Sequence, residues 1–266
     1  MSDIDDLPAY YYEDLGDGAF ASTVATQSPW DFSMQHGGPP SALLLRCIEQ
    51  HVGDISMRAA RISVDFLGPI PQGRCEIAVT TLRPGRRVRL VEATMQIADR
   101  TVVVERVWLI NHQDGRVLPI DATALAPPLP AAMPQRFFLG VDPSWGYGRS
   151  IEWRFVTGGL DQPGPATVWT RVRIPLIAGE SPSALQRLII VADSTNGVSG
   201  PINFDGWLFI PPGITLTVMR PPRTDWIYLD AQTQTDHDGI GIAQATLCDD
   251  EGFIGTAAQP LLIAPA

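Results

Sequence analysis

Hydrophobic and polar positions alternate along the chain in a way that predicts two similar sets of β-strands, each preceded by a helix. The first set has strand-like runs at residues 61–66, 75–82, 87–97 and 101–110, after a helix expected at residues 41–51. The second has runs at residues 215–219, 226–235, 239–248 and 253–263, after a helix expected at residues 182–192. The runs are rich in Val, Ile, Thr and Trp, and Gly and Pro mark the turns between them. The pattern predicts an α+β fold made of two helix-and-sheet units.

Both expected helices are apolar on nearly every side. The first contains Leu43, Leu44, Leu45 and Ile48, and the second contains the apolar run at residues 188–191. A helix with so little polar surface must be surrounded by protein. We also expect Ser181 to cap the second helix, with Pro182 in its first position.

The two units look like copies of one another. Pro40-Ser41-Ala42-Leu43 returns at residues 182–185, and at one offset of 152 residues Ala93-Thr94 corresponds to Ala245-Thr246 and Gly68-Pro69 to Arg220-Pro221. Several matches in order at one offset indicate a duplicated unit. A buried helix wrapped by a curved antiparallel sheet, twice over, is a double hot-dog arrangement. We predict an N-terminal unit at residues 1–124 with an acidic N-terminal segment, a Pro- and Ala-rich linker at 125–135, and a C-terminal unit at 136–266.

Composition narrows the classes of partner and site. The 266 residues are 45% hydrophobic and 18% charged, enough for a substantial core. The formal net charge is −10, and no basic stripe is present, so neither nucleic acid nor a membrane surface is an expected partner. Cys47, Cys75 and Cys248 lie far apart, which favours three reduced thiols over disulfides or a zinc site. The N-terminus has neither a basic nor a long apolar region, and we expect a cytoplasmic protein.

Common catalytic and cofactor motifs are missing from the sequence. It contains no G-x-S-x-G nucleophile motif and no G-x-x-x-x-G-K-[ST] phosphate loop, and its four histidines show no metal-ligand spacing. We therefore predict no cofactor and no metal.

Six segments, in order along nearly the whole chain, carry a resemblance to a known family. They are H-G-G-P-P-S-A-L-L at 36–44, V-A-D-S at 191–194, T-L-T-V-M-R-P-P at 215–222, L-D-A-Q-T at 229–233, D-G-I-G-I-A at 238–243 and A-A-Q-P-L-L at 257–262. Together they resemble the acyl-CoA thioesterase II (TesB-like) family, especially proteins of the actinobacterial type. The resemblance implies a double hot-dog fold that hydrolyses an acyl-CoA to free acid and CoA.

The resemblance also implies that an Asp, a Ser or Thr, and a Gln position the attacking water. The Asp maps onto Asp193 and the Gln onto Gln259, each within a matching segment. A gapless count back from Arg220 places the hydroxyl residue at Pro211, which has no hydroxyl, so Thr215 is the nearest replacement.

Asp193 and Gln259 are also unusual for reasons that do not depend on the resemblance. Asp193 lies near the C-terminal end of an apolar helix, where the helix dipole disfavours a negative charge, and such unfavourable choices often mark functional sites. Gln259 corresponds to Val107 at the repeat offset, and a buried Gln requires hydrogen-bond partners. The alternatives are that Asp193 turns into solvent, that Gln259 is exposed, and that Thr215 is an ordinary strand residue.

The segment before the first helix is the candidate substrate-binding region. Gly37, Gly38 and Ser41 have N–H groups that can stabilise a developing oxyanion. His36 either contacts substrate or belongs to the turn into the helix.

Three functions fit these observations. The first is acyl-CoA hydrolysis by a water that Asp193, Gln259 and Thr215 position. The second is binding of acyl-CoA or another apolar ligand without turnover, and the third is hydration or dehydration of acyl chains, for which no paired His and Asp is evident. We expect acyl-CoA as the partner molecule. We also expect the protein to be a homo-oligomer, a dimer of double hot-dogs.

Overall fold

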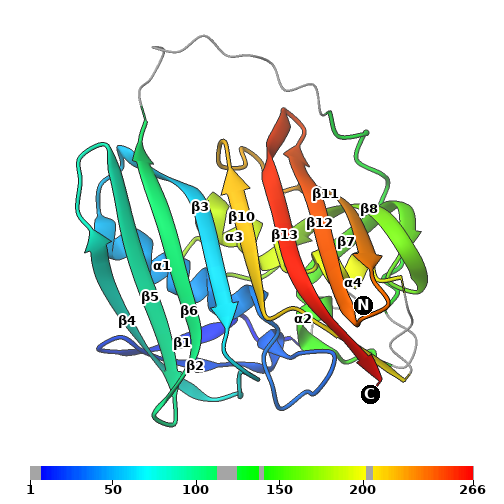
Figure 1. The fold of residues 1–266 in the computed structure, drawn as a ribbon, viewed down its shortest axis with the longest axis horizontal. Helices are drawn as coiled ribbons and strands as arrows, with labels where there is room; N and C mark the ends of the chain where they lie inside the picture. Colours follow the sequence, from blue (N-terminus) through cyan, green and yellow to red (C-terminus); the bar gives the residue numbers. More distant parts are fainter. Residues whose placement is uncertain (1–6, 113–124, 138–140, 202–205, 266) are drawn as a thin grey trace.

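The two predicted sets of strands form one continuous antiparallel sheet in the computed structural model, which describes residues 7–112, 125–137, 141–201 and 206–265 (Figure 1). The first unit contributes β3 (Met57–Phe66), β4 (Arg74–Arg83), β5 (Val88–Ile97) and β6 (Arg100–Asn111). The second contributes β10 (Gly213–Val218), β11 (Ile227–Thr235), β12 (Ile240–Asp249) and β13 (Gly252–Pro265). The described strands follow the order β1-β2-β4-β5-β6-β3-β10-β13-β12-β11-β8-β7, with β9 paired to β13.

The two long helices pack against each other on one face of this sheet. They are α1 (Gly38–Val52) and α3 (Ala184–Ala192), and they run antiparallel, because Gly38 lies against Ile190 while Glu49 contacts Gln186. Their apolar side chains are almost completely buried, as expected for helices without a polar face. The double hot-dog prediction is thereby confirmed.

Helix boundaries differ slightly from the prediction. The first helix begins at Gly38, and Pro39 and Pro40 fit its first turn because N–H groups there have no partner within the helix. The expected cap at Ser181 is wrong. Ser183 caps α3 instead, in a capping box with Gln186, because the backbone of Ser183 is extended and its hydroxyl accepts from the Gln186 N–H.

The junction between the units preserves the symmetry of the repeat. Strands β3 and β10 are antiparallel neighbours, and Thr215 lies directly opposite Ser63. These two residues also correspond at the repeat offset of 152. A pseudo-twofold axis therefore passes between Ser63 and Thr215 and relates the two units.

Additional elements flank the two units. They are β1 (Tyr12–Gly16), β2 (Ala19–Ser22), a 3-10 helix (Val24–Thr26), α2 (Gly146–Arg149), β7 (Ile151–Gly159), β8 (Gln162–Val172), α4 (Thr195–Val198) and β9 (Trp207–Ile210). The hydrophobic pattern of the sequence did not predict them. The described residues at 125–135 lie outside helix and strand. The unit boundaries at 124 and 136 stay predictions.

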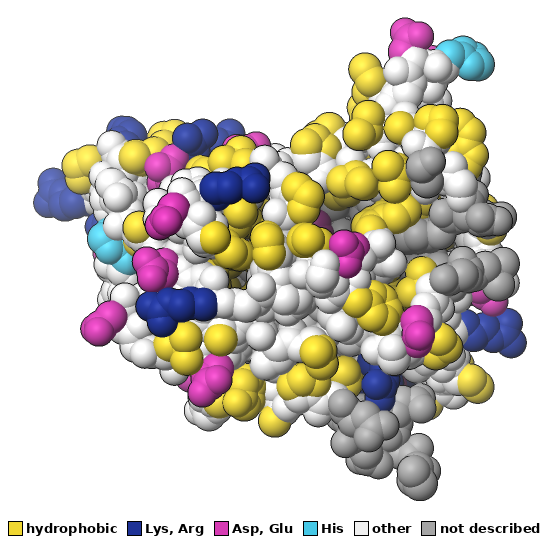
Figure 2. All heavy atoms as spheres, turned by 90° about the horizontal axis from the view of Figure 1, so that it is seen from below, with side chains coloured by type: hydrophobic (Ala, Val, Ile, Leu, Met, Phe, Trp, Pro, Cys, Tyr) yellow, Lys and Arg dark blue, Asp and Glu magenta, His cyan; other side chains and the backbone are white. Residues whose placement is uncertain are grey.

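Two further features of the molecule are the mixture of charges on its surface and the character of its helices. On the face shown in Figure 2, basic and acidic side chains are interspersed rather than gathered into one basic patch. Within the described part of the chain, none of the helices has the length and apolar character needed to span a membrane.

Candidate active site

Asp193 and Gln259 meet in the protein interior at the end of α3. Asp193 is the C-cap residue of this helix and is only 3% exposed, because the buried apolar residues before it draw the helix end inward. Gln259 is fully buried on β13, on the same inward face as Ala257 and Leu261. Its Nε2 donates to Asp193 Oδ1 at 3.1 Å. The structure thus brings the two predicted residues into direct contact.

The orientation of the Gln259 amide is fixed by its neighbours. Its Oε1 accepts a hydrogen bond from the Asn196 N–H at 3.0 Å, and its Nε2 also contacts the Asp193 carbonyl oxygen at 3.2 Å. A backbone N–H must face the amide oxygen, so the amide nitrogen must face the carboxylate. Gln259 therefore holds one oxygen of Asp193 in a defined position.

His36 holds the other oxygen of the carboxylate, so the structure contains a paired His and Asp that was not evident from the sequence. Its Nδ1 lies 2.9 Å from Asp193 Oδ2, and its ring stacks on Tyr147 with centroids 3.7 Å apart. An acceptor cannot face a carboxylate oxygen favourably, so this geometry requires a proton on Nδ1. The Gly38 N–H is directed at the same Nδ1 at 3.3 Å, and a proton on Nδ1 leaves no lone pair there for it to bond.

Tyr147 supports the site from behind the imidazole. Its hydroxyl lies 2.6 Å from the Ile190 carbonyl oxygen and 2.7 Å from Ser194 Oγ, near the end of α3. Burial, reinforced by the charge of Asp193, raises the pKa of Tyr147 well above its usual range, so the side chain stays a neutral phenol. No motif in the sequence identifies Tyr147, because its contact with Ser194 joins residues far apart in the chain.

Gly37 and Gly38 permit the close approach of the two units. A Cβ at Gly37 would lie 2.9 Å from Asp193 Oδ2 and 2.4 Å from the Phe66 ring, and a Cβ at Gly38 would lie 2.5 Å from the Ile190 carbonyl oxygen. Any larger residue would push the first unit away from Asp193. Ser41, the third expected N–H donor, instead donates its N–H to the Gly37 carbonyl within the first helical turn.

Thr215 is the predicted site residue that the structure does not bring to this cluster. It is exposed, and the neighbours on either side, Ile214 and Leu216, are buried. Because side chains alternate across a strand, Thr215 projects from the outer face of the sheet, whereas Asp193 lies on the inner one. Thr215 pairs with Ala258, one residue before Gln259, so the two side chains lie on opposite faces. The expectation that it assists Asp193 is corrected accordingly.

A small cavity of about 30 Å³ adjoins the cluster. Its wall includes His36, Ser194 and Asn196, together with aromatic side chains of Trp30 and Phe209. A water molecule needs roughly 10–15 Å³, so the cavity has room for one, and polar partners are present in its wall. The described residues contain no group of His, Cys, Asp and Glu suited to a metal ion.

The fold and this site define a double hot-dog protein with a buried carboxylate held by an amide and an imidazole. A model of the acyl-CoA thioesterase N-terminal domain matches residues 26–116, and a model of the C-terminal domain matches residues 122–263. The chain belongs to the acyl-CoA thioesterase family and is a thioester hydrolase.

Solved structures support the family fold. A Novosphingobium aromaticivorans protein described as a thioesterase has a TM-score of 0.72 at 22% identity, covering 95% of this chain and 98% of that one. A Thermobifida fusca protein described as a thioesterase II has a TM-score of 0.69 at 18% identity, with 96% of each chain covered. The acyl-CoA thioesterase II TesB2 of Mycobacterium marinum has a TM-score of 0.69 at 16% identity, with 96% of each chain covered. A search of curated proteins finds no match.

Proposed function

We propose that the protein hydrolyses a fatty or related acyl-CoA to free acid and CoA, with Asp193 as the base that activates water. The observation that carries this proposal is the buried Asp193 carboxylate, whose two oxygens are each held by a different side chain. Such a group is fixed in direction and can still accept further hydrogen bonds. An ionised carboxylate has about four lone-pair sites, and Gln259 and His36 use two of them.

The remaining lone pairs accept a hydrogen from the attacking water. As the water oxygen bonds to the thioester carbonyl carbon, its proton passes to Asp193, and the carbonyl electrons move onto the oxygen. When the tetrahedral intermediate collapses, the C–S bond breaks and CoA leaves as a thiolate, which takes the proton from Asp193. A thiol of ordinary pKa, about 8.5, needs little acid assistance to leave.

The Gly38 N–H is the donor that we assign to the developing oxyanion. The proton on His36 Nδ1 faces Asp193, so this backbone N–H has no acceptor in the imidazole. It lies at the N-terminal end of α1, where the helix dipole favours negative charge. His36 and Gly37 complete the substrate-facing side, next to the cavity that has room for water.

The test is release of free CoA from acyl-CoAs of graded chain length. Asp193→Asn removes the base, and we expect kcat to fall by at least about 100-fold. Gln259→Leu leaves the carboxylate unsupported, and we expect a loss of about 10- to 100-fold, since small misplacements are costly. Thr215→Val, on the outer face of the sheet, serves as the matched control and should keep wild-type activity.

Two results would contradict this assignment. Wild-type activity in a folded Asp193→Asn variant would remove Asp193 from the role of base. A folded wild-type protein that releases no CoA from any acyl-CoA, but binds one, would instead support the non-catalytic binding protein.

A further inference from the structure

Aromatic side chains form much of the wall of the small cavity beside the candidate active site. They are Trp30, Trp145, Trp153 and Phe209. The polar part of the wall includes His36, which contacts Asp193, and Asn196, whose N–H holds the Gln259 amide. An acyl group that enters this cavity from beside Asp193 therefore meets these rings.

Two of the rings are held in place by hydrogen bonds and close packing. The Trp145 indole N–H donates to the Gln27 carbonyl oxygen at 2.8 Å. The Trp153 indole N–H donates to the Gly148 carbonyl oxygen, also at 2.8 Å. A Cβ at Gly148 would lie 2.2 Å from the Trp145 ring, so this ring packs directly on the backbone. Moving either indole aside would break its hydrogen bond in the protein interior, which is costly.

Trp30 and Phe209 form an aromatic pair in the same wall. Their rings meet edge to face, with centroids 4.9 Å apart. The side-chain amide of Asn196 donates to the Phe209 carbonyl oxygen at 3.2 Å, and the Asn196 N–H donates to Gln259. Asn196 thereby ties the aromatic wall to the amide that holds Asp193.

The volume of the cavity limits the size of the acyl group. It is about 30 Å³, and a water-sized group takes roughly 10–15 Å³, so there is room for about two or three such groups. The attacking water takes one of these places. A methyl or methylene group is close to water in size, so about one or two carbon atoms beyond the thioester carbonyl fill the rest. This corresponds to an acetyl or propionyl group.

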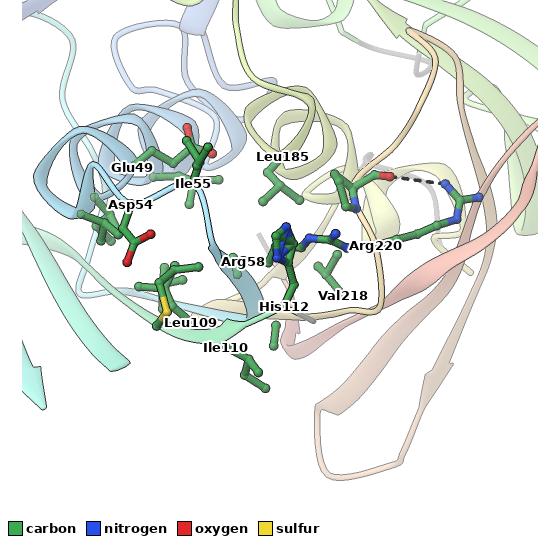
Figure 3. Close-up of a pocket in the computed structure, with 18 of the residues that line it drawn as sticks. Glu49, Asp54, Ile55, Arg58, Leu109, Ile110, His112, Leu185, Val218 and Arg220 are labelled. Atoms are coloured by element: carbon green, nitrogen blue, oxygen red, sulfur yellow. Dashed lines mark hydrogen bonds between the residues drawn. The ribbon is translucent and has the colours of Figure 1, made fainter. Parts of the chain in front are cut away.

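A much larger cavity, of about 530 Å³, is poorly placed to receive a longer chain (Figure 3). Its lining includes Leu109 and Leu185 but neither Asp193 nor Gln259. Leu185 and Asp193 lie at opposite ends of α3, about 12 Å apart along its axis at roughly 1.5 Å per residue. The α3 residues at 188–191 between them are fully buried. A chain that starts at Asp193 would have to displace these residues to reach the larger cavity.

We propose that the substrate is a short-chain acyl-CoA, carrying an acetyl or propionyl group, and that Trp30 and Phe209 limit the chain length. This inference rests on the proposed function, because it names the acyl group of the same reaction. A longer chain must push an aromatic ring out of its packing, and this clash lowers kcat/KM for that substrate.

Release of CoA from acetyl-, propionyl-, hexanoyl- and octanoyl-CoA by the full-length protein tests the proposal. We expect kcat/KM to be highest for acetyl- or propionyl-CoA and at least about tenfold lower for octanoyl-CoA. Trp30→Ala enlarges the cavity at a partly exposed position, and it should raise the ratio of octanoyl to propionyl kcat/KM at least about tenfold. Phe209→Leu is a smaller enlargement and should change the ratio in the same direction by less.

The matched control is Leu185→Ala, which enlarges the other cavity, at the far end of α3, and should leave this ratio unchanged. A wild type that hydrolyses octanoyl-CoA as well as propionyl-CoA would overturn the short-chain assignment and leave hydrolysis at Asp193 standing. Folded Trp30→Ala and Phe209→Leu variants that both keep the wild-type ratio would overturn the role of these rings. A folded wild type that releases no CoA from any of the four substrates would overturn the proposed function together with this inference.

Discussion

At the scale of single residues, Glu105 on β6 is the most unusual buried group outside the candidate active site. It is 0% exposed, and neither carboxylate oxygen has a hydrogen-bond partner among the described residues. Burial first, and the charge of Glu49 second, raise the pKa of Glu105 well above its ordinary value of 4.5. Glu105 corresponds to Ala257 at the repeat offset, so the second unit has an apolar side chain in this place. Glu105 is consequently protonated in the folded protein over a wide range of pH.

The raised pKa of Glu105 predicts that the free energy of unfolding depends on pH. Above pH 4.5 the unfolded chain releases the Glu105 proton while the folded chain keeps it. The contribution of Glu105 to the free energy of unfolding is therefore largest in acid. It falls by about 1.4 kcal/mol per pH unit as pH rises toward the folded-state pKa.

Glu105→Gln should remove the pH-dependent contribution of Glu105 to the free energy of unfolding. The variant therefore gains stability over the wild type as pH rises from 4.5. Denaturant unfolding across a pH series measures the difference. Glu76→Gln, at an exposed position, is the control and should show no such gain. A difference that stays constant with pH would mean that Glu105 ionises normally.

Residue-level reasoning from the sequence pointed to part of the candidate active site. Asp193 stood out by its unfavourable place at a helix end, and Gln259 by contrast with Val107, because both conflicts are local. Thr215 was misplaced because its choice rested on nearness in sequence, whereas the face of a strand is decided by parity. Tyr147 could not be found, since its contact with Ser194 joins residues far apart in the chain and its contact with His36 arises only when the two units pack together.

At the scale of elements, the contact between the start of α1 and the end of α3 sets the geometry of the candidate active site. The backbone of Gly38 approaches the Ile190 carbonyl so closely that a side chain has no room. The apolar patterns predicted both helices, but this antiparallel contact depends on tertiary packing that periodicity does not encode. The flanking strands β7 and β8 were also missed, since Gly and Pro interrupt their sequences at Gly158, Pro163 and Pro165.

Gly38→Ala should therefore separate the two helices and shift Asp193. We expect a loss of about 1–3 kcal/mol in the free energy of unfolding, as for overpacked cores, and a loss of CoA release of at least about tenfold. Denaturant unfolding and the CoA assay measure the two effects.

Ser183→Ala is the comparison, because it removes the cap at the other end of α3. It should cost about 0.5–2 kcal/mol of stability yet retain most activity. If Gly38→Ala stays fully active, the close contact does not position Asp193.

At the scale of the whole molecule, neither unit contains the complete candidate active site. The second unit supplies Asp193 and Gln259, and the first supplies His36 and Gly38. The repeat in the sequence predicted the two units, but not that one site draws on both. The cytoplasmic location and the dimer of double hot-dogs stay predictions.

Separate expression of the two units tests this shared site. The fragment 136–266 should release no CoA by itself, because it has no donor for Asp193 Oδ2 and exposes the edge of β10. Co-expression with the fragment 1–135 should restore CoA release. A tag on one fragment shows whether the two fragments copurify. Activity of the fragment 136–266 alone would show that His36 and Gly38 are dispensable.

The axis between Ser63 and Thr215 also affects how sequence change acts on the molecule. In a symmetric pair of identical chains, any substitution alters both halves at once, so a change useful on one side is imposed on the other. Here the paired positions are encoded separately, and one can be Gln259 while the other is Val107. Joining the halves in one chain thus lets the two positions of each pair change independently, so that a carboxamide can stand in one half without being imposed on the other.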